Sequence, residues 1–206
     1  MLNNSLVLGI DLGTSGVRIA IINAKSKILF TSSKRYSKGL EISGDWINSL
    51  INLIKEIPQG LKDELVSCSV AGTSGTLLAC KKNGEPIGKA LPYFLTCSEY
   101  SYEIENLFTK ECAGSSVSGS VGRALRLLDL YGNDIILRHQ ADWLSGWLIN
   151  NWEYGEEGNN IRMGWEISNN SWPKKFKNLN WLKCLPKIIS SGQIMGYICN
   201  LSLIHI

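Results

Sequence analysis

The sequence predicts an α/β protein with a mixed central sheet, and three observations lead to this fold class. The chain opens with three short apolar, β-branched runs that alternate with turn residues. The first amphipathic helix comes only after the third run. A fourth apolar run follows that helix. Doubly wound parallel folds alternate strands and helices from the beginning, so this order excludes them.

The opening three runs are expected to form an antiparallel meander. Leu6–Ile10, Val17–Ile22 and Lys27–Ser33 have the composition of strands. Asp11–Gly16, with two Gly and two hydroxyl residues, separates the first two, and Asn23–Ser26 separates the next two. These intervals contain the residue types of tight turns and are too short for helices.

The first helix is expected between the third and fourth strands. Ser43 or Asp45 can cap its N-terminus. Pro58 and Gly60 end it. Leu65–Ala71 then has the character of the fourth strand. The buried face of the helix is expected to consist of apolar residues at helical spacing: Trp46, Leu50, Leu53, Ile54 and Ile57.

This order of three strands, a helix and a strand is that of the ribonuclease H-like fold, which actin-like ATPases share, with helices flanking the mixed sheet. A small-residue loop, Gly72–Thr76, follows the fourth strand. Asn83-Gly84 then predicts a hairpin between Leu77–Lys81 and Pro86–Leu91. Four helices are expected in the remainder: Glu99–Lys110, Val121–Tyr131, Gln140–Asn150 and about Leu179–Ser190.

Composition describes an ordinary globular protein with one sizeable core. The chain has 206 residues, a formal net charge of +3 and 44% hydrophobic residues. Lys174, Lys175 and Lys177 form the densest basic cluster, and a solvated loop explains it as well as nucleic acid would. We therefore expect no nucleic-acid partner.

The sequence also predicts a cytoplasmic protein without a membrane partner. Its first apolar run is broken at once by Asp11, so it is not a signal peptide. No run approaches the roughly 18 apolar residues that a membrane span needs. The six cysteines include no C-x-x-C pair and are expected to be reduced thiols.

The turn between the first two strands has the residues of a phosphate site. Gly13 has no Cβ, so the backbone N–H groups of this turn can come close to a phosphate. The hydroxyls of Thr14 and Ser15 can donate to phosphate oxygens, and Asp11 can hold a hydrated Mg²⁺. A P-loop is excluded because no Gly-Lys-Ser/Thr follows, and a dinucleotide fingerprint because a strand follows Gly16. A plain hairpin turn is the alternative.

Several segments resemble the FGGY carbohydrate kinases, the family of xylulose, ribulose and glycerol kinases. Gly9–Arg18 is similar to the first phosphate motif of that family nearly residue for residue, and the resemblance covers roughly residues 5–198. Three further segments fall where that family has equivalents: Asp45-Trp46, Val70–Thr76 with the Asn83-Gly84 hairpin, and Gln140–Leu144. Two more, Asn159–Trp165 and Ser171–Pro173, resemble a ribulose- or xylulose-kinase-like branch found in photosynthetic organisms.

The resemblance implies an ATP-dependent kinase for a ketopentose such as ribulose or xylulose. Its cofactors would be ATP and Mg²⁺, and its partner a small sugar. Carried over residue by residue, Gly13, Thr14 and Ser15 contact the nucleotide phosphates. Asp11 holds Mg²⁺ through water and also reaches the substrate.

The sugar side of the implied site lies after the fourth strand. Thr73 and Ser74 are the substrate-binding hydroxyls that the resemblance implies, and a polar turn that ends a strand is the alternative. Tyr93–Cys97 departs from the Trp/Tyr-Asn-Asp-x-Arg stretch of many relatives. The polar contacts of that stretch are therefore missing here.

The same resemblance places the catalytic base, an Asp in a Gly-rich stretch, beyond this sequence. Residues 1–206 are therefore expected to be the N-terminal domain of such a kinase, incomplete at its C-terminus and lacking the second, nucleotide-binding domain. Losing a positioned base costs about 10²–10⁴-fold in rate, so the chain by itself is expected to be inactive. Two alternatives stay open: a non-catalytic sugar- or phosphate-binding module, and another actin-like ATPase such as a chaperone or acetate-kinase relative.

Two further patterns favour structural interpretations. Trp143 and Trp147 share one face of a predicted helix and are expected to pack in the core rather than to stack on sugar. Glu156 and Glu157 are neighbours on an extended segment, so their side chains should point apart into solvent.

Overall fold

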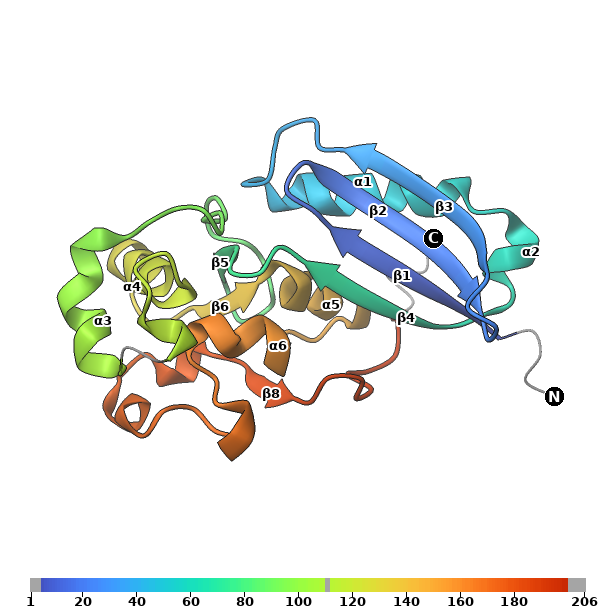
Figure 1. The fold of residues 1–206 in the computed structure, drawn as a ribbon. Coiled ribbons are helices and arrows are strands. Elements are labelled where there is room, and N and C mark those ends of the chain that lie inside the picture. Colours follow the sequence, from blue (N-terminus) through green and yellow to red (C-terminus); the bar gives the residue numbers. More distant parts are fainter. Residues whose placement is uncertain (1–4, 110–111, 200–206) are drawn as a thin grey trace. The chain divides into compact units, whose positions relative to one another are not determined.

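The computed structural model describes residues 5–109 and 112–199 of the chain (Figure 1). These residues divide into two compact units, and the chain passes from the first to the second between Thr73 and Ser74. The first unit contains one sheet and the second contains two, and each unit has its own buried apolar residues.

The first unit is built on a four-stranded mixed sheet, as the sequence predicted. Its strands are β1 (Leu6–Leu12), β2 (Gly16–Asn23), β3 (Ile28–Arg35) and β4 (Leu65–Gly72), in the order β3-β2-β1-β4. β1 pairs antiparallel with β2, and β2 pairs antiparallel with β3. β4 returns after the helix and pairs parallel with β1. The meander followed by a crossover is therefore confirmed.

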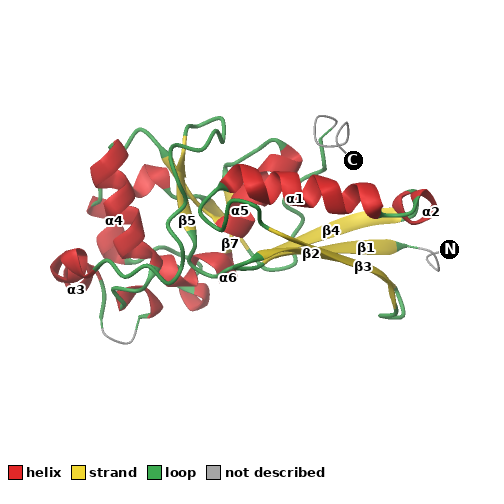
Figure 2. Ribbon diagram, turned by 90° about the horizontal axis from the view of Figure 1, so that it is seen from above, coloured by secondary structure: helices red, strands yellow, loops and turns green. Residues whose placement is uncertain are grey.

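Helix α1 (Ser43–Glu56) lies against one face of this sheet and packs on β2 and β3 (Figure 2). Buried and more exposed residues alternate along β1, because successive side chains of a strand point to opposite faces. The predicted apolar face of the helix is confirmed, since all five of its residues are buried: Trp46, Leu50, Leu53, Ile54 and Ile57.

The start of α1 differs from the prediction. The helix has Ile42 at its N-cap position, and no side chain caps it. The carboxylate of Asp45 turns back instead and accepts hydrogen bonds from Ser37 Oγ at 2.8 Å and from the Lys38 backbone N–H at 2.7 Å. Asp45 therefore holds the segment between β3 and α1, and a short helix, α2 (Gln59–Lys62), follows α1.

The second unit contains two small sheets. β5 (Leu77–Cys80) pairs antiparallel with β6 (Ile136–His139), and β7 (Tyr154–Glu156) pairs parallel with β8 (Lys187–Ile189). The predicted Asn83-Gly84 turn is present, with backbone bridges from β5 to Pro86 and Leu91. The segment between those two residues forms no continuous strand, and the partner of β5 along its length is β6, which the sequence did not reveal.

Helices of the second unit include α3 (Ser101–Leu107), α4 (Ser120–Tyr131), α5 (Gln140–Ile149) and the single turn α6 (Glu157–Asn160). The predicted helices 121–131 and 140–150 are confirmed, and the predicted helix 99–110 is shorter. Short 3-10 segments fill much of the rest: Ser98–Tyr100, Ala113–Ser115, Ile161–Met163, Ile167–Asn169, Lys174–Asn178 and Leu182–Cys184.

The predicted helix over 179–190 is wrong. Leu185 has an extended backbone, with φ −79° and ψ 155°, and Pro186 follows it. A proline disfavours the helical conformation in the residue before it and cannot donate a backbone hydrogen bond. The chain therefore leaves its 3-10 turn at Cys184 and enters β8.

The core of the second unit is rich in aromatic side chains, and of the two tryptophans expected in the core, Trp143 is buried and Trp147 is only partly buried. Phe176 is fully buried and stacks on Trp172, with ring centroids 6.0 Å apart. Phe108 and Trp181 contact Phe176 from other directions. Trp143 is buried, and its Nε1–H donates to the Gly84 carbonyl at 2.9 Å. Its role is core packing.

Two further expectations can be compared with the structure. All six cysteines lie among the described residues, and none of them forms a disulfide. Across residues 5–109 and 112–199, no helix combines the length and apolar character needed to cross a membrane.

Candidate functional site

The predicted phosphate turn closes the hairpin of β1 and β2. The Gly13 N–H donates to the Gly16 carbonyl at 2.9 Å, so this amide is used within the turn. Thr14 and Ser15 form the exposed tip. The Ser15 carbonyl accepts a hydrogen bond from the Tyr36 N–H at 3.0 Å, which ties the tip to the end of β3. The hydroxyls of the tip are thus held on a rigid turn.

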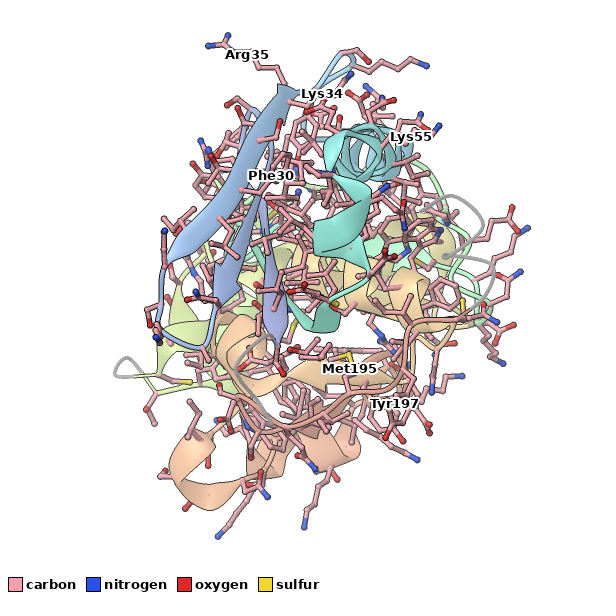
Figure 3. The ribbon with its side chains drawn as sticks, turned by 90° about the vertical axis from the view of Figure 1, so that its right-hand side faces the viewer. Phe30, Lys34, Arg35, Lys55, Met195 and Tyr197 are labelled. Carbon is pink, nitrogen blue, oxygen red and sulfur yellow. The ribbon has the colours of Figure 1, made fainter. Side chains whose placement is uncertain are left out.

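Gly16 is required by the close passage of the neighbouring strand. A Cβ at this position would lie 2.3 Å from the Lys34 carbonyl oxygen and 2.9 Å from the Arg35 Cα. Both residues lie at the end of β3 (Figure 3). Real Cβ atoms do not approach backbone atoms so closely, so glycine is what lets β3 support the turn.

Asp11 points away from the packed interior. Its Oδ2 accepts a hydrogen bond from Arg18 Nη1 at 2.8 Å, and both side chains are about half exposed. The two residues are directly opposite in the β1/β2 register. The hydrogen bond between Gly13 and Gly16 fixes that register. A tight turn over Gly13–Gly16 was therefore the signal in the sequence that could have identified Arg18 as the partner of Asp11.

Thr73 lies beside the same turn. Its backbone N–H donates to the Leu12 carbonyl at 3.1 Å, directly after β4 ends. Because β1 and β4 run parallel, their carboxyl ends meet at one edge of the sheet. Asp11, Gly13 and Thr73 are therefore brought together by the first unit, and Ser74 is the exposed first residue of the second unit.

The face of the sheet opposite α1 carries an open hollow of about 780 Å³. The β-sheet register arranges its lining in two rows that cross the four strands. One row contains the Asp11–Arg18 pair, and the other is made of small side chains. The rows are Ser33, Arg18, Asp11 and Ala71, and Thr31, Ala20, Gly9 and Ser69.

The second unit contains a buried group of Ser120, His139 and Asp142. His139 Nε2 lies 2.9 Å from Ser120 Oγ, and its Nδ1 lies 3.9 Å from Asp142 Oδ2. Burial lowers the pKa of His139 to about 3, and nearby Arg123 adds to this shift. Burial also raises the pKa of Asp142 to about 6. All three side chains are inaccessible to substrate, so this arrangement supports the fold and not hydrolysis.

Asp142 is the centre of a hydrogen-bond network that the sequence did not indicate. It accepts from the Glu156 N–H at 3.0 Å, from Asn159 Nδ2 at 2.8 Å and from Asn160 Nδ2 at 2.9 Å. These bonds satisfy a buried carboxylate and attach α5 to the turn after β7.

Glu156 and Glu157 are not simply solvated, contrary to the prediction. Glu156 accepts from the Asn159 N–H at 2.9 Å and from Ser191 Oγ. Glu157 Oε1 accepts from the Ser191 N–H at 2.9 Å. Both carboxylates therefore bind Ser191, just after β8, instead of pointing apart into solvent as expected. The segment after β8 continues through Met195 and Tyr197 (Figure 3).

The described residues were compared with the requirements of a metal site built from protein side chains alone. Within residues 5–109 and 112–199, no three Asp, Glu, His or Cys side chains gather closely enough to hold an ion. Asp11 alone would fit Mg²⁺ through water, because Mg²⁺ usually keeps several waters and takes its other ligands from phosphates.

Comparison with known proteins identifies the fold. No family model matches the sequence. Among solved structures, glycerol kinase from Plasmodium falciparum with ADP is similar at 17% identity and a TM-score of 0.80, over 97% of this chain and 46% of that chain. Xylulose kinase from Rhodospirillum rubrum is 12% identical, with a TM-score of 0.81 over 97% and 46% of the two chains. Gluconate kinase from Lactobacillus acidophilus is 13% identical, with a TM-score of 0.77 over 98% and 45%.

These neighbours agree in the fold and differ in the substrates that their names give. The chain spans less than half the length of each neighbour, while each match covers nearly all of this chain. The mixed sheet with flanking helices is therefore the actin-like ATPase fold, as the strand order predicted. The chain has the fold of the FGGY-type carbohydrate kinases over a length equal to about 46% of theirs.

Proposed function

We propose that the chain is the N-terminal part of an ATP-dependent carbohydrate kinase and supplies the phosphate turn and one side of the sugar site. One observation carries this proposal. Because β1 and β4 pair in parallel, Asp11, the turn and Thr73 lie at the same end of the sheet. The chain that contains this sheet has the fold of solved sugar kinases. In this proposal, residues 1–206 form the first domain, and the nucleotide pocket belongs to a second domain.

The turn would contact the phosphates through its exposed tip. The hydroxyls of Thr14 and Ser15 would donate to phosphate oxygens. The Gly13 N–H already donates to Gly16, so Gly13 contributes by leaving space beside the turn, where a Cβ would lie 3.1 Å from Arg18 Nη1. Asp11 would hold a hydrated Mg²⁺, and that ion would neutralise charge on the phosphates when bound.

The sugar is proposed to be a ketopentose such as ribulose or xylulose. Thr73 and Ser74 follow β4 and would hydrogen-bond sugar hydroxyls. Short polar side chains suit such a site, because each sugar hydroxyl left buried and unpaired costs about 1–3 kcal/mol. The known structures with this fold include kinases named for glycerol, xylulose and gluconate, so the fold by itself does not choose among them.

Phosphate transfer is not proposed for this chain alone. Transfer to a sugar hydroxyl needs a carboxylate that accepts the proton. Asp11 is the carboxylate beside the turn in the first unit, and it is paired with Arg18 and assigned to the metal. The chain with ATP, Mg²⁺ and ribulose or xylulose should therefore release no ADP above the rate without enzyme.

Isothermal calorimetry tests the binding role directly. The 206-residue chain is titrated with D-ribulose, with D-xylulose and with inorganic tripolyphosphate in the presence of Mg²⁺, because the turn is proposed to contact phosphates while the nucleotide pocket belongs to the second domain. Asp11→Asn should weaken binding of Mg²⁺–tripolyphosphate about tenfold or more, because a charged partner of the metal is lost. It should change stability by less than about 1 kcal/mol, since the ion pair with Arg18 is exposed.

Asp63→Asn is the matched control, because Asp63 is an exposed carboxylate of the same unit beyond α2. It should leave both ligand affinities unchanged. Equal loss of tripolyphosphate binding in both variants, or no binding of sugar or tripolyphosphate to the unmodified chain, would contradict the proposed function. Sugar binding without any phosphate binding would favour the non-catalytic sugar-binding module instead.

A further inference from the structure

The side chain of Arg123 is buried completely in the second unit, which is unusual for an arginine. It lies on α4, and its guanidinium is surrounded by backbone carbonyl oxygens. Nε donates to the Gly75 carbonyl at 2.8 Å. Nη1 donates to the carbonyls of Tyr93 at 3.1 Å and Leu95 at 2.7 Å. Nη2 donates to the Ser118 carbonyl at 3.2 Å.

These four bonds join three separate pieces of chain. Gly75 directly follows Ser74, Tyr93 and Leu95 belong to the segment after the Asn83-Gly84 turn, and Ser118 precedes α4. Burial lowers the pKa of Arg123 to about 10, so the guanidinium remains protonated at neutral pH. One cation therefore donates to four backbone carbonyls, of which that of Ser118 also accepts from Arg162 Nη2 at 3.4 Å.

The shape of the loop after Ser74 depends on this arrangement. Gly75 has a φ of +96°, and a Cβ there would lie 2.9 Å from Arg123 Nη2. The next residue, Thr76, is also buried, and its Oγ1 accepts from the Tyr93 N–H at 3.2 Å. The loop is thus fixed on the side of Tyr93 by two independent contacts, while Ser74 is exposed at its start.

We infer that Arg123 is a positioning residue for the sugar site: it fixes the backbone at Gly75 so that Ser74 is held in the orientation that binds a sugar hydroxyl. This inference rests on the proposed function, which assigns Ser74 to the sugar. Arg123 itself donates to backbone carbonyls and acts through the loop. An error of about 1 Å in a positioning group is enough to change binding or rate greatly.

Arg138 provides a matched control within the same unit. It is also almost fully buried, and its guanidinium donates to backbone carbonyls. Its Nε donates to Trp152 at 2.6 Å, and its Nη1 donates to Leu137 at 2.7 Å and to Cys184 at 3.0 Å. Burial lowers its pKa to about 10 as well. Arg138 differs from Arg123 in binding none of the carbonyls that position Ser74.

The test compares Arg123→Met, Arg123→Lys and Arg138→Met in the 206-residue chain. Sugar affinity is measured by calorimetry with D-ribulose and D-xylulose, and thermal unfolding is measured in parallel. Arg123→Met should weaken sugar binding about tenfold, the equivalent of one hydrogen bond to the sugar, and Arg138→Met should change it less than about threefold. Both should lower the unfolding temperature. Arg123→Lys should bind sugar more tightly than Arg123→Met, because it keeps a cation at this position. Its affinity should stay below that of the unmodified chain, because one ammonium cannot reach all four carbonyls.

Amide hydrogen exchange gives a second measurement that needs no ligand. Arg123→Lys should increase exchange at residues 75–76 and 93–95, and Arg138→Met should not. Equal sugar affinity in the unmodified chain and the folded Arg123 variants would overturn the inference and leave the proposed function standing. A chain that binds neither sugar would overturn the proposed function, and the inference with it. A loss of affinity as large in Arg138→Met would show a general structural effect and contradict a positioning role.

Discussion

At the scale of single residues, the candidate site depends on close approaches that only particular side chains allow. Asp11 is paired across the hairpin with Arg18, and Gly16 lies under the backbone of β3. The first relation follows from the register of β1 and β2, and the second follows from the register of β2 and β3. The chemical types of these residues were visible in the sequence, but their partners were set by the pairing of strands.

Gly16→Ala should lower the free energy of unfolding by about 1–3 kcal/mol, as overpacking does elsewhere. The added Cβ would meet the backbone of Lys34 and Arg35, which cannot move aside as a flexible side chain could. Urea denaturation followed by far-UV circular dichroism measures the effect.

Gly9→Ala is the control for this change. Gly9 lies in the same hairpin, and a Cβ there would lie 3.8 Å from the Ala20 carbonyl, an ordinary contact. Its stability should be unchanged or higher by up to about 1 kcal/mol, because alanine loses less backbone entropy on folding. Equal destabilisation by both substitutions would show that the close passage of β3 does not explain Gly16.

At the scale of secondary-structure elements, the junction of β6 and α5 contains several buried polar side chains. His139 ends β6, and Asp142 lies in the first turn of α5. The strand pairs with β5, and Asp142 bonds to the turn after β7. A short sequence therefore links three elements, and its titratable groups make the stability of the unit depend on pH.

The two groups act in opposite directions. Burial lowers the pKa of His139 from 6.5 to about 3, so its contribution to stability is complete above pH 6.5 and is lost as pH falls toward 3. Burial raises the pKa of Asp142 from 3.8 to about 6, so protonation of Asp142 favours the folded state as pH falls through that window. The larger shift belongs to His139, so acid should destabilise the protein overall.

His139→Gln removes the titration of His139 and leaves that of Asp142. Between pH 7 and pH 4.5, the unmodified chain should lose about 2 kcal/mol more stability than the variant, from 1.36 kcal/mol per pKa unit. Urea denaturation at the two pH values measures the change in the free energy of unfolding for each protein. Because each protein is compared with itself, a lower stability of the variant at pH 7 does not affect the comparison. The same pH dependence in both proteins would show that His139 is not kept neutral by folding.

At the scale of the whole molecule, the described chain consists of two compact units with separate cores. In the first unit, α1 covers one face of the four-stranded sheet. The second unit is held by a cluster that includes Leu77, Leu127 and Phe176. A destabilising change in one core should therefore act first on its own unit.

Leu50→Ala should destabilise the first unit by about 2–5 kcal/mol, the usual range for a buried leucine. Hydrogen exchange should rise in β1–β4 and remain unchanged across residues 74–199. Leu127→Ala, at an equally buried position of the second unit, is the reciprocal control and should show the opposite pattern. Increased exchange in both units for either substitution would show that they unfold as one cooperative body.

The sequence by itself determined the first unit and the residue types of the site. Strand and helix periods, the Gly- and hydroxyl-bearing turn and the late first helix specify the meander, the crossover and the mixed sheet, because each depends on residues close together in the chain. The second unit was less predictable. The β5–β6 pairing joins residues about sixty positions apart, and β7–β8 pairing depends on a distant segment.

Only the tertiary structure decided which groups meet. Three sets of contacts join parts of the chain that are separate in the sequence: the pair of Asp11 and Arg18, the carbonyls around Arg123, and the hydrogen bonds of Ser191 with Glu156 and Glu157. Local composition does not encode such contacts, because they depend on strand register and helix placement. The residue types of the candidate phosphate turn could be read from the sequence, and the contacts that hold the loops around the candidate site could not.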